Sequence, residues 1–355
     1  MPTRVLIPIY TFVIRYLTPA RIFVLSFAGV VLAGGILLWM PFSGVKHHIS
    51  FVDALFTSAS AVCVTGLVVF DVGTTLSLAG QIITMLLFQC GGLGIITFSV
   101  FFFHLMGRSI SFKGREIVQS TFLHTPQKDF QIILKSVLLS TLIVESLGAL
   151  LLFVRFSHDF PAQTALYHAV FNAVSAFNNA GFSLFSDNLI GYQGDFIVNM
   201  TVMGLIIVGG IGFIVQHEIL AYYKDRRKKP SLHTKMVLIT TGILILAGAI
   251  LFYFFERNHI IRDAPWHTKV LISLFQSVTP RTAGFNTVDI GQLTNDTILL
   301  MMALMFVGAS PGSTGGGVKT TSTALLVLML WNRMKGREDV NIFNRTIPRE
   351  TISRA

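Results

Sequence analysis

Three segments of the chain share a pattern of residues that could bind a cation. Each consists of an apolar stretch too short to cross a membrane, followed by a polar turn that contains glycine. An aromatic residue precedes the glycine by 10, 10 and 9 residues in the three copies. The pairs are Phe56 and Gly66, Phe171 and Gly181, and Phe275 and Gly284. Glycine allows backbone conformations and close approaches that other residues avoid, so such a turn can present its carbonyl oxygens to an ion.

The residues around these glycines are candidate ligands of a cation filter. A short helix that ends at the turn points the negative end of its dipole at the ion, and carbonyl oxygens replace the ion's water. Glycine in an apolar chain also marks close helix packing, but three matched copies favour the filter. The candidate filter residues are Val62, Cys63, Val64, Thr65, Gly66, Asn178, Asn179, Ala180, Gly181, Arg281, Thr282, Ala283 and Gly284.

Charged residues in apolar surroundings need either a partner or a function. Arg281 would repel a permeating cation, so we expect its side chain to point away and brace the filter through carbonyl groups or a carboxylate such as Asp289. Glu145, His217 and Glu218 also lie in apolar stretches and are functional candidates. Pairing within the helix bundle is the alternative, and for His217 and Glu218 an interfacial position is favoured.

The last long apolar stretch contains a segment that cannot continue a helix at low cost. Residues 309–317 hold one proline, four glycines and three hydroxyl-bearing residues. We predict an intramembrane loop just below the filter that acts as a gate, with a static kink as the alternative. The candidate gate residues are Gly308, Ala309, Ser310, Pro311, Gly312, Ser313, Thr314, Gly315, Gly316, Gly317 and Lys319. Lys319 either faces the path as an electrostatic barrier or reaches the cytoplasmic interface.

The composition places these segments in a membrane. Of the 355 residues, 52% are hydrophobic and only 12% are charged, which is about half the charged share of a soluble domain. A membrane-spanning helix needs ~20 mainly apolar residues. We predict six spans, at residues 22–40, 78–105, 132–154, 196–223, 236–255 and 297–331.

Basic residues cluster on alternate connections between these spans. They precede the first span, lie between the second and third and between the fourth and fifth, and follow the sixth. This positive-inside pattern predicts a cytoplasmic N-terminus and a filter toward the extracellular side. It also accounts for the net charge of +10 without nucleic-acid binding.

The predicted fold is an all-α polytopic membrane protein made of parallel repeats. Each repeat contains a span, a re-entrant pore helix, a filter loop and a second span. The predicted parts are a cytoplasmic N-terminal segment at 1–15, pore repeat A at 16–110, pore repeat B at 111–225, pore repeat C at 226–336 with the gate loop at 308–319, and a cytoplasmic linker at 337–355.

The filter segments at 61–67, 176–183 and 279–287 and the loop at 308–320 resemble those of the Trk/Ktr/HKT superfamily of potassium transporters, in particular the bacterial KtrB-type membrane subunit. The resemblance implies four such units with pseudo-fourfold symmetry around an ion pore, and channel-like uptake of K⁺ across the plasma membrane. In this superfamily potassium selectivity goes with glycine in every filter, which the three glycines here meet. It also implies that Na⁺ is a candidate activator.

The same resemblance implies partners. KtrB-type subunits form homodimers in membrane lipid and sit on a cytoplasmic ring of KtrA-type nucleotide-binding subunits, so ATP or ADP would act only through that ring. No covalent cofactor is expected. Because three repeats are present, we expect a fourth repeat to be missing after residue 355.

Two other classes of function are less compatible with the sequence. A secondary transporter with broken helices for another small solute would use inverted repeats, whereas these repeats are parallel. An enzyme would need a nucleophile with a spaced base or a metal cluster, and neither is apparent. The glycine-rich loop is not a phosphate-binding loop, because Val318 separates its last glycine from Lys319.

Overall fold

The computed structural model describes residues 19–45, 49–105, 130–227, 229–336, 340–342 and 345–347. The predicted N-terminal segment 1–15, the boundary between repeats A and B at residue 110, and most of the linker 337–355 lie outside the described residues.

The described helices follow a similar order three times. The first set is α2 (Pro19–Trp39), α3 (Phe51–Val62) and α5 (Leu78–Leu105). The second set is α7 (Phe130–Phe156), α8 (Ala162–Phe177), α9 (Phe196–Ile211) and α10 (Phe213–Lys224). The third set is α11 (Leu232–Glu256), α12 (Trp266–Val278), α13 (Asn295–Phe306) and α14 (Thr320–Met334). Short helical turns in the connections are η1 (Pro41–Ser43), α4 (Val72–Thr75), η3 (Ile190–Tyr192) and η4 (Ile290–Gln292).

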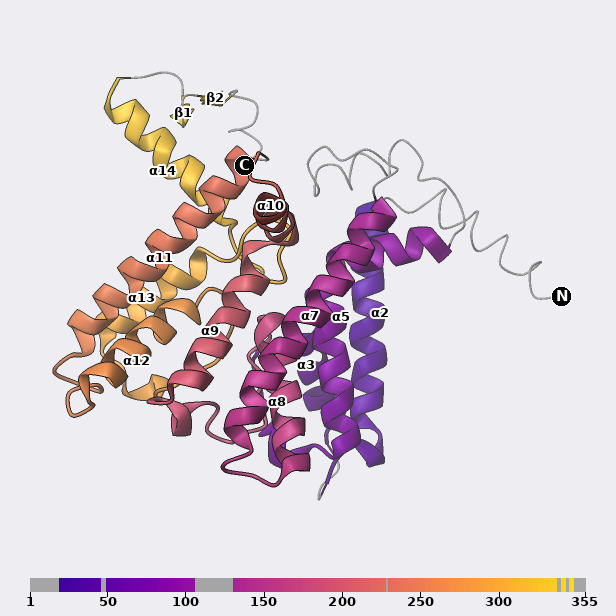
Figure 1. The fold of residues 1–355 in the computed structure, drawn as a ribbon. Coiled ribbons are helices and arrows are strands. Elements are labelled where there is room, and N and C mark those ends of the chain that lie inside the picture. The colour runs from indigo at the N-terminus through magenta and orange to yellow at the C-terminus, as the bar shows by residue number, and fades with distance from the viewer. Residues whose placement is uncertain are drawn as a thin grey trace.

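This architecture confirms the predicted helical membrane fold. One small addition is an antiparallel pair of strands, β1 (Val340–Ile342) and β2 (Arg345–Ile347), in the segment predicted as a linker. The long helices run roughly side by side, with α10 and α14 toward one end and α3, α8 and α12 nearer the other (Figure 1). Within each set the first long helix packs on the short one: α2 on α3, α7 on α8 and α11 on α12. Neighbouring sets also touch, because α5 contacts α8 and α9 contacts α12.

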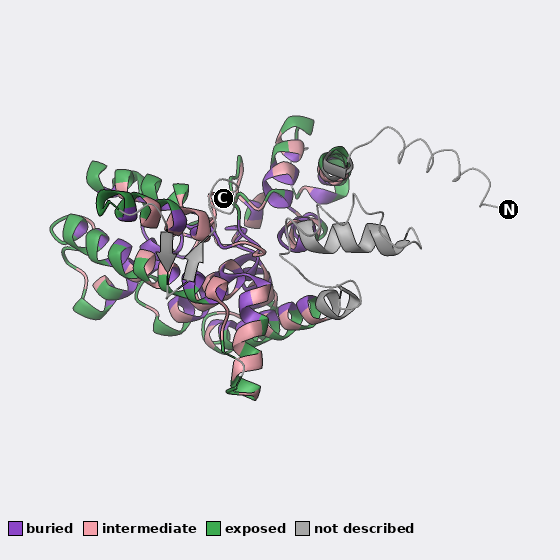
Figure 2. Cartoon of the chain, turned by 90° about the horizontal axis from the view of Figure 1, so that it is seen from above, coloured by how far each residue is buried: buried purple, intermediate pink, exposed green. Residues whose placement is uncertain are grey.

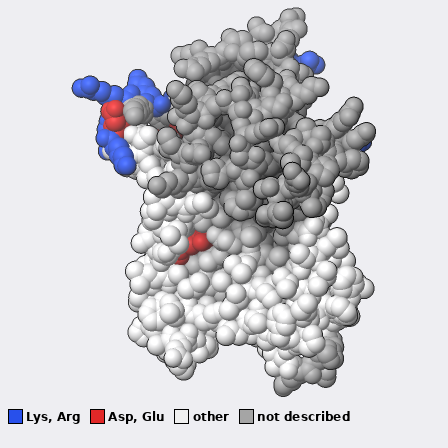
Figure 3. Space-filling model, turned by 90° about the vertical axis from the view of Figure 1, so that its right-hand side faces the viewer, with Lys and Arg blue, Asp and Glu red and all other residues white. Residues whose placement is uncertain are grey.

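The surface of the described part is that of a protein in lipid. Helix α7 from Ser136 to Phe156 and helix α11 are long and apolar enough to cross a membrane, and α9 with α10 counts as a third span if the bent pair is one span. Outward-facing side chains on these helices are large and apolar; Leu142 is 62% exposed and Ile243 is 60% exposed. Figure 2 shows exposed residues on the outer sides of the helices and buried residues between them. In Figure 3 the described surface is almost uncharged, and its Lys and Arg side chains gather toward one end.

The predicted span at 196–223 is not one helix. It breaks at Gly212, where α9 and α10 meet at an angle of 102°. Gly212 has a φ of 93°, in the left-handed region that side chains disfavour, and a Cβ atom there would lie 2.6 Å from the carbonyl oxygen of Pro311. Apolar composition predicted a continuous span because it cannot show that a second segment of chain takes over the hydrogen bonds of the broken helix.

Buried phenylalanines hold the short helices of the second and third sets. Phe171 on α8 and Phe275 on α12 are fully buried, whereas Phe56 on α3, the third aromatic residue of the sequence pattern, is 41% exposed. Phe88 of α5 packs edge-on against Phe171 with ring centroids 5.5 Å apart, and it stacks on Phe182 at 5.9 Å. The aromatic position therefore anchors the core in two of the three sets.

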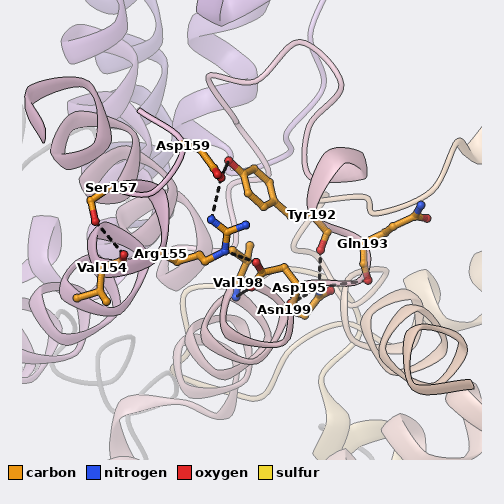
Figure 4. A network of polar contacts seen from close by, with 9 residues as sticks. All are labelled: Val154, Arg155, Ser157, Asp159, Tyr192, Gln193, Asp195, Val198 and Asn199. Atoms are coloured by element: carbon orange, nitrogen blue, oxygen red, sulfur yellow. Dashed lines mark hydrogen bonds and ion pairs between the residues drawn. The ribbon is translucent and has the colours of Figure 1, made fainter. Parts of the chain in front are cut away.

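A polar cluster ties the end of α7 to the connection that precedes α9 (Figure 4). The guanidinium of Arg155 donates to Asp195 and, over 2.8 Å, to Asp159. The hydroxyl of Tyr192 donates to Asp159 over 3.0 Å, and burial raises the pKa of Tyr192 to about 12, so this hydroxyl keeps its proton. The amide of Asn199 donates to the carbonyl oxygen of Tyr192 over 2.8 Å. This cluster fixes the chain that follows the second filter segment.

Replacing Arg155 by Gln should destabilise the protein, because two carboxylates lose their charged donor. Hydrogen bonds to charged groups contribute about 1.5–3 kcal/mol each, and we expect the lower end because Arg155 is partly exposed. The apparent unfolding temperature of the purified protein in detergent should fall by about 2–5 °C. Arg257→Gln is the matched control, since among the described residues the Arg257 side chain contacts only the ring of Phe254, at 5.7 Å. Equal unfolding temperatures for both variants would contradict this role.

Candidate functional site

The three filter segments adopt the same unusual backbone conformation. The glycines have positive φ angles, and so do the residues two positions before them. The values are 54° at Val64 and 76° at Gly66, 58° at Asn179 and 72° at Gly181, and 79° at Thr282 and 82° at Gly284. For a residue with a side chain, the left-handed region costs of order 1–3 kcal/mol and persists only where the surrounding structure imposes it. The shared conformation is therefore imposed by the tertiary structure.

The three glycines converge on one place, although they come from different sets of helices. A Cβ atom built on Gly66 would lie 2.7 Å from the carbonyl oxygen of Ala180, and one built on Gly181 would lie 2.6 Å from that of Ala283. A Cβ atom on Gly284 would lie 3.2 Å from the Cα atom of Gly181. Backbone thus meets backbone at this point, and a side chain at any of the three positions would crowd a neighbouring segment.

Hydroxyl groups brace two of the three segments from behind. Ser175, in the last turn of α8, donates to the carbonyl oxygen of Phe182 over 2.7 Å. Thr279, at the end of α12, donates in the same way to the carbonyl oxygen of Phe285. Each hydroxyl therefore holds the residue that follows the filter glycine. The corresponding hydroxyl of Ser60 is buried and has no hydrogen-bond partner among the described residues.

The first and second segments differ in how exposed their predicted filter residues are. Cys63 and Thr65 are exposed, whereas the second segment from Asn178 to Gly181 is buried. The Val62 carbonyl contacts Gly91 of α5, and the side chain of Asn178 contacts Gly92 of the same helix. Val62 and Asn178 therefore face α5.

Among the described residues, Arg281 makes no hydrogen bond of the kind predicted, either to a carbonyl group or to Asp289. The Arg281 side chain is buried, but its Nε atom has no hydrogen-bond partner among the described residues. Asp289 instead caps the turn η4, because its side chain accepts hydrogen bonds from the N–H of Gly291 at 2.9 Å and from the amide of Gln292 at 3.0 Å. The Asp289 carboxylate is hydrogen-bonded within its own turn, and it does not pair with Arg281.

A cavity of ≈ 440 Å³ lies beside two of the three converging glycines. Its lining includes Gly66, Gly181 and three carboxylates, those of Asp71, Asp187 and Asp289. Burial raises the pKa of Asp71, but hydrogen bonds from the Ser186 and Thr74 side chains and from the backbone N–H groups of Gly73 and Thr74 outweigh it and lower the pKa below the usual range. An ionised carboxylate at this mouth attracts cations toward the glycines.

The glycine-rich loop after α13 binds the break between α9 and α10. Three backbone hydrogen bonds join them: Ser310 N–H to Gly210 at 3.0 Å, Thr314 N–H to Gly209 at 3.2 Å, and Phe213 N–H to Gly312 at 2.9 Å. The loop also closes on itself, because the N–H of Gly308 donates to Val318 over 3.0 Å and that of Ala309 to Gly316 over 3.0 Å. These bonds satisfy backbone groups of two broken helices at once.

The loop also touches the second and third filter segments. Asn179 donates to the hydroxyl of Thr314 over 2.8 Å, and this hydroxyl donates to the Phe177 carbonyl over 3.0 Å. A Cβ atom on Gly315 would clash with the side chain of Thr282. Lys319 donates to the carbonyl oxygen of Gly315 over 3.0 Å, so its charge is held by the loop itself.

Two of the ionisable candidates have partners other than basic residues. Glu218 of α10 accepts hydrogen bonds from the N–H of Ser231 at 2.9 Å and from the hydroxyl of Thr234 at 2.7 Å, which ties α10 to α11. Glu145 of α7 accepts hydrogen bonds from two amide side chains. Among the described residues, no group of three His, Cys, Asp or Glu side chains could hold a metal ion.

Sequence reasoning missed the residues that support the filter. The hydroxyls of Ser175 and Thr279 stand 6 and 5 residues before their glycines, so aligning the segments would have found them. Gln89 of α5 accepts a hydrogen bond from Asn178 in the second segment, but no repeated spacing in the sequence points to it. Among the residues two positions before the glycines, the left-handed conformation was foreseeable only at Asn179, because asparagine adopts it more readily than valine or threonine.

Comparison with known proteins identifies the family. The family described as TrkH, cation transport protein, matches residues 22–355. The Ktr system potassium uptake protein B of Vibrio alginolyticus is 36% identical, over 94% of this chain and 74% of that protein. The potassium/sodium uptake protein NtpJ of Enterococcus hirae is 37% identical, over 96% of this chain and 76% of that protein.

A solved structure shares the fold. The crystal structure of the potassium transporter TrkH from Vibrio parahaemolyticus matches with a TM-score of 0.69 at 21% identity, over 96% of this chain and 68% of that one. The family match and the sequence identities extend over nearly the whole chain, filter segments and glycine-rich loop included. The chain therefore belongs to the TrkH family of cation transport proteins, whose members are transporters and not enzymes.

Proposed function

We propose that this chain is the membrane-embedded, ion-conducting part of a potassium uptake system in the plasma membrane. The observation that carries the proposal is the convergence of Gly66, Gly181 and Gly284, two of which line a cavity that also contains three carboxylates. In this assignment carbonyl oxygens of the three segments replace the water of the permeating ion, and pore helices α3, α8 and α12 direct the negative ends of their dipoles at it.

Potassium is the proposed substrate because all three filter positions are glycine and because relatives over 94–96% of the chain are named as potassium uptake proteins. One of these relatives is named as a potassium/sodium uptake protein. Na⁺ is therefore included as a proposed activator.

The glycine-rich loop at 308–319 is the proposed gate. Its bonds to the α9–α10 break and to Asn179 support this assignment, because a loop so placed can obstruct the path and can respond to movement of α10. By the family resemblance we also propose a homodimer, a cytoplasmic KtrA-type ring as the site of ATP or ADP, and a cytoplasmic N-terminus.

Replacing Gly66 by Ser tests the filter. A side chain at a φ of 76° is strained, and its Cβ would press on the carbonyl oxygen of Ala180. Strain of about 1–3 kcal/mol at the ion ligands should lower the preference for K⁺ over Na⁺ by about tenfold. The measurement is Rb⁺ uptake, with K⁺ and Na⁺ as competitors, in cells that lack their own potassium uptake and express the complete coding sequence.

Gly191→Ser is the matched control, since a Cβ atom at Gly191 meets nothing within 4 Å. It should leave the K⁺ preference unchanged. If uptake is absent, or is insensitive to Gly66→Ser, the pore assignment is wrong, and a secondary transporter with broken helices for another small solute becomes the better hypothesis.

Replacing Thr314 by Val tests the gate. Valine keeps the volume but removes the hydroxyl that joins the loop to Asn179 and to the Phe177 carbonyl. Losing hydrogen bonds of about 1 kcal/mol each should free the loop and raise the maximal rate of Rb⁺ uptake about fivefold, with little change in KM. Thr84→Val is the control, because Thr84 is also buried and, among the described residues, its hydroxyl bonds only to the Gly80 carbonyl of its own helix, α5. An unchanged or lower rate for Thr314→Val would contradict a gate at this loop.

Replacing Asp187 by Asn tests the outer cavity. Asp187 is exposed and lines the cavity beside the glycines. Removing its charge should raise the KM for Rb⁺ about twofold at low ionic strength, and the effect should disappear above 0.1 M salt, where charges are screened beyond about 10 Å. Asp263→Asn, an exposed position outside the cavity lining, should not change KM. A change in KM that persists at high salt would indicate a structural effect instead.

A further inference from the structure

Glu145 is a buried carboxyl group in the middle of a membrane-spanning helix. It lies on α7 and is 8% exposed. An ionisable side chain at membrane depth is costly, so it is found where it has a specific role. The ion pairs among the described residues involve Arg155 and Glu256, so Glu145 has no basic partner in this part of the chain.

Both oxygens of Glu145 accept hydrogen bonds from amide side chains. The amide nitrogen of Gln89 on α5 lies 3.3 Å from Oε2, and that of Asn178 lies 3.1 Å from Oε1. The same Asn178 amide nitrogen also lies within hydrogen-bond distance of the Val174 carbonyl, at 2.8 Å, and of the side-chain oxygen of Gln89, so its two hydrogens are shared among three acceptors. Since donors occupy both carboxyl oxygens, the arrangement suits a hydrogen-bond acceptor that orients amides rather than a ligand of a bound cation.

Asn178 is the residue at which the pore helix α8 ends and the second filter segment begins. Its backbone N–H bonds to Val174 over 3.1 Å, so side chain and backbone together close the last turn of the helix. Its side-chain oxygen has no hydrogen-bond partner among the described residues and lies against Gly92 of α5. The orientation of Asn178 is thus determined from behind, by α5 and α7, and not by the ion path.

The position of Asn178 is transmitted directly to the filter. Asn179 follows in the left-handed conformation, and the next carbonyl, that of Ala180, is the one against which Gly66 packs. Gly91, beside Gly92 on α5, contacts the Val62 carbonyl of the first segment. Helix α5 therefore backs both segments, and the Gln89, Asn178 and Glu145 side chains join α5, the second segment and α7.

We propose that Glu145 is a positioning residue of the filter: by holding the amides of Asn178 and Gln89, it aligns the second segment with the first and so contributes to ion selectivity. This inference rests on the proposed function. Glu145 touches no ion in this role. It acts through Asn178. Losing Glu145 therefore alters the preference between cations while the protein still folds.

The test compares Glu145→Gln with the wild type by competition of K⁺ and Na⁺ against Rb⁺ uptake, corrected for the amount of protein in the membrane. Glutamine has one acceptor oxygen where the carboxylate has two, so it breaks one of the two amide contacts. The preference for K⁺ over Na⁺ should fall by about three- to tenfold, as expected from one buried hydrogen bond. Glu145→Asp, which keeps both acceptor oxygens, should restore most of that preference.

Asn178→Ala should reduce the preference by a similar factor, and combining it with Glu145→Gln should add little, because both act through one contact. Glu256→Gln is the control for a merely structural effect. Glu256 is fully buried and accepts two hydrogen bonds of 2.8 Å from Thr294, outside the filter segments, so this variant should lower thermal stability without changing the preference. If Glu145→Gln does not accumulate in the membrane, Gln89→Met is the second variant. It removes the hydrogen bond between Gln89 and Glu145 and should shift the preference in the same direction.

The outcomes separate this inference from the proposed function. If the wild type takes up Rb⁺ and Gly66→Ser alters its preference, but Glu145→Gln and Gln89→Met do not, only the positioning role is overturned. Additive effects of Glu145→Gln and Asn178→Ala would also overturn it. If the wild type shows no uptake, the proposed function fails, and this inference fails with it.

Discussion

Unpaired backbone inside a membrane is the constraint on which the rest of this structure depends. Carbonyl and N–H groups outside helices are tolerated at membrane depth only when protein pairs them or when they line a path for water and ions. The chain has such backbone at three filter segments, at Gly212 and at the loop 308–319. At the helix break, backbone groups of the loop 308–319 supply the hydrogen-bond partners. Near the converging glycines, the hydroxyls of Ser175 and Thr279 bind the carbonyl groups of Phe182 and Phe285, and the carbonyl oxygens left unpaired are the proposed ligands of the ion.

The glycine clusters in α5, at the end of α9 and directly after α13 follow from the same constraint. Close helix packing would explain them in part. Here they bring backbone close to backbone: Gly91 meets the carbonyl of Val62 at the end of α3, Gly209 meets the carbonyl of Phe177 at the end of α8, and Gly308 meets Gly316 within the loop. A side chain at any of these positions would push a filter or loop segment out of place, so the clusters position the site.

The three sets of helices share a plan but differ in how they support it. In the second and third, a buried phenylalanine anchors the short helix and a hydroxyl braces the residue after the glycine; in the first, Phe56 is exposed and Ser60 has no partner among the described residues. The loop 308–319 belongs to the third set, yet it binds the helix break of the second. The hydroxyl contacts that brace the segments and the hydrogen bonds that hold the loop therefore both lie in the second and third sets.

The sequence alone determined the features that depend on local spacing. The repeated aromatic and glycine pairs, the short helices and the break in the last apolar stretch were all predictable, because composition and period decide where helices form and end. Only the tertiary structure decided the bend at Gly212, the left-handed conformation of Val64, and the failure of Arg281 to reach Asp289. It also decided the contact between Asn179 and Thr314, which are 135 residues apart. Such partners depend on which helices pack together, and no local pattern encodes that choice.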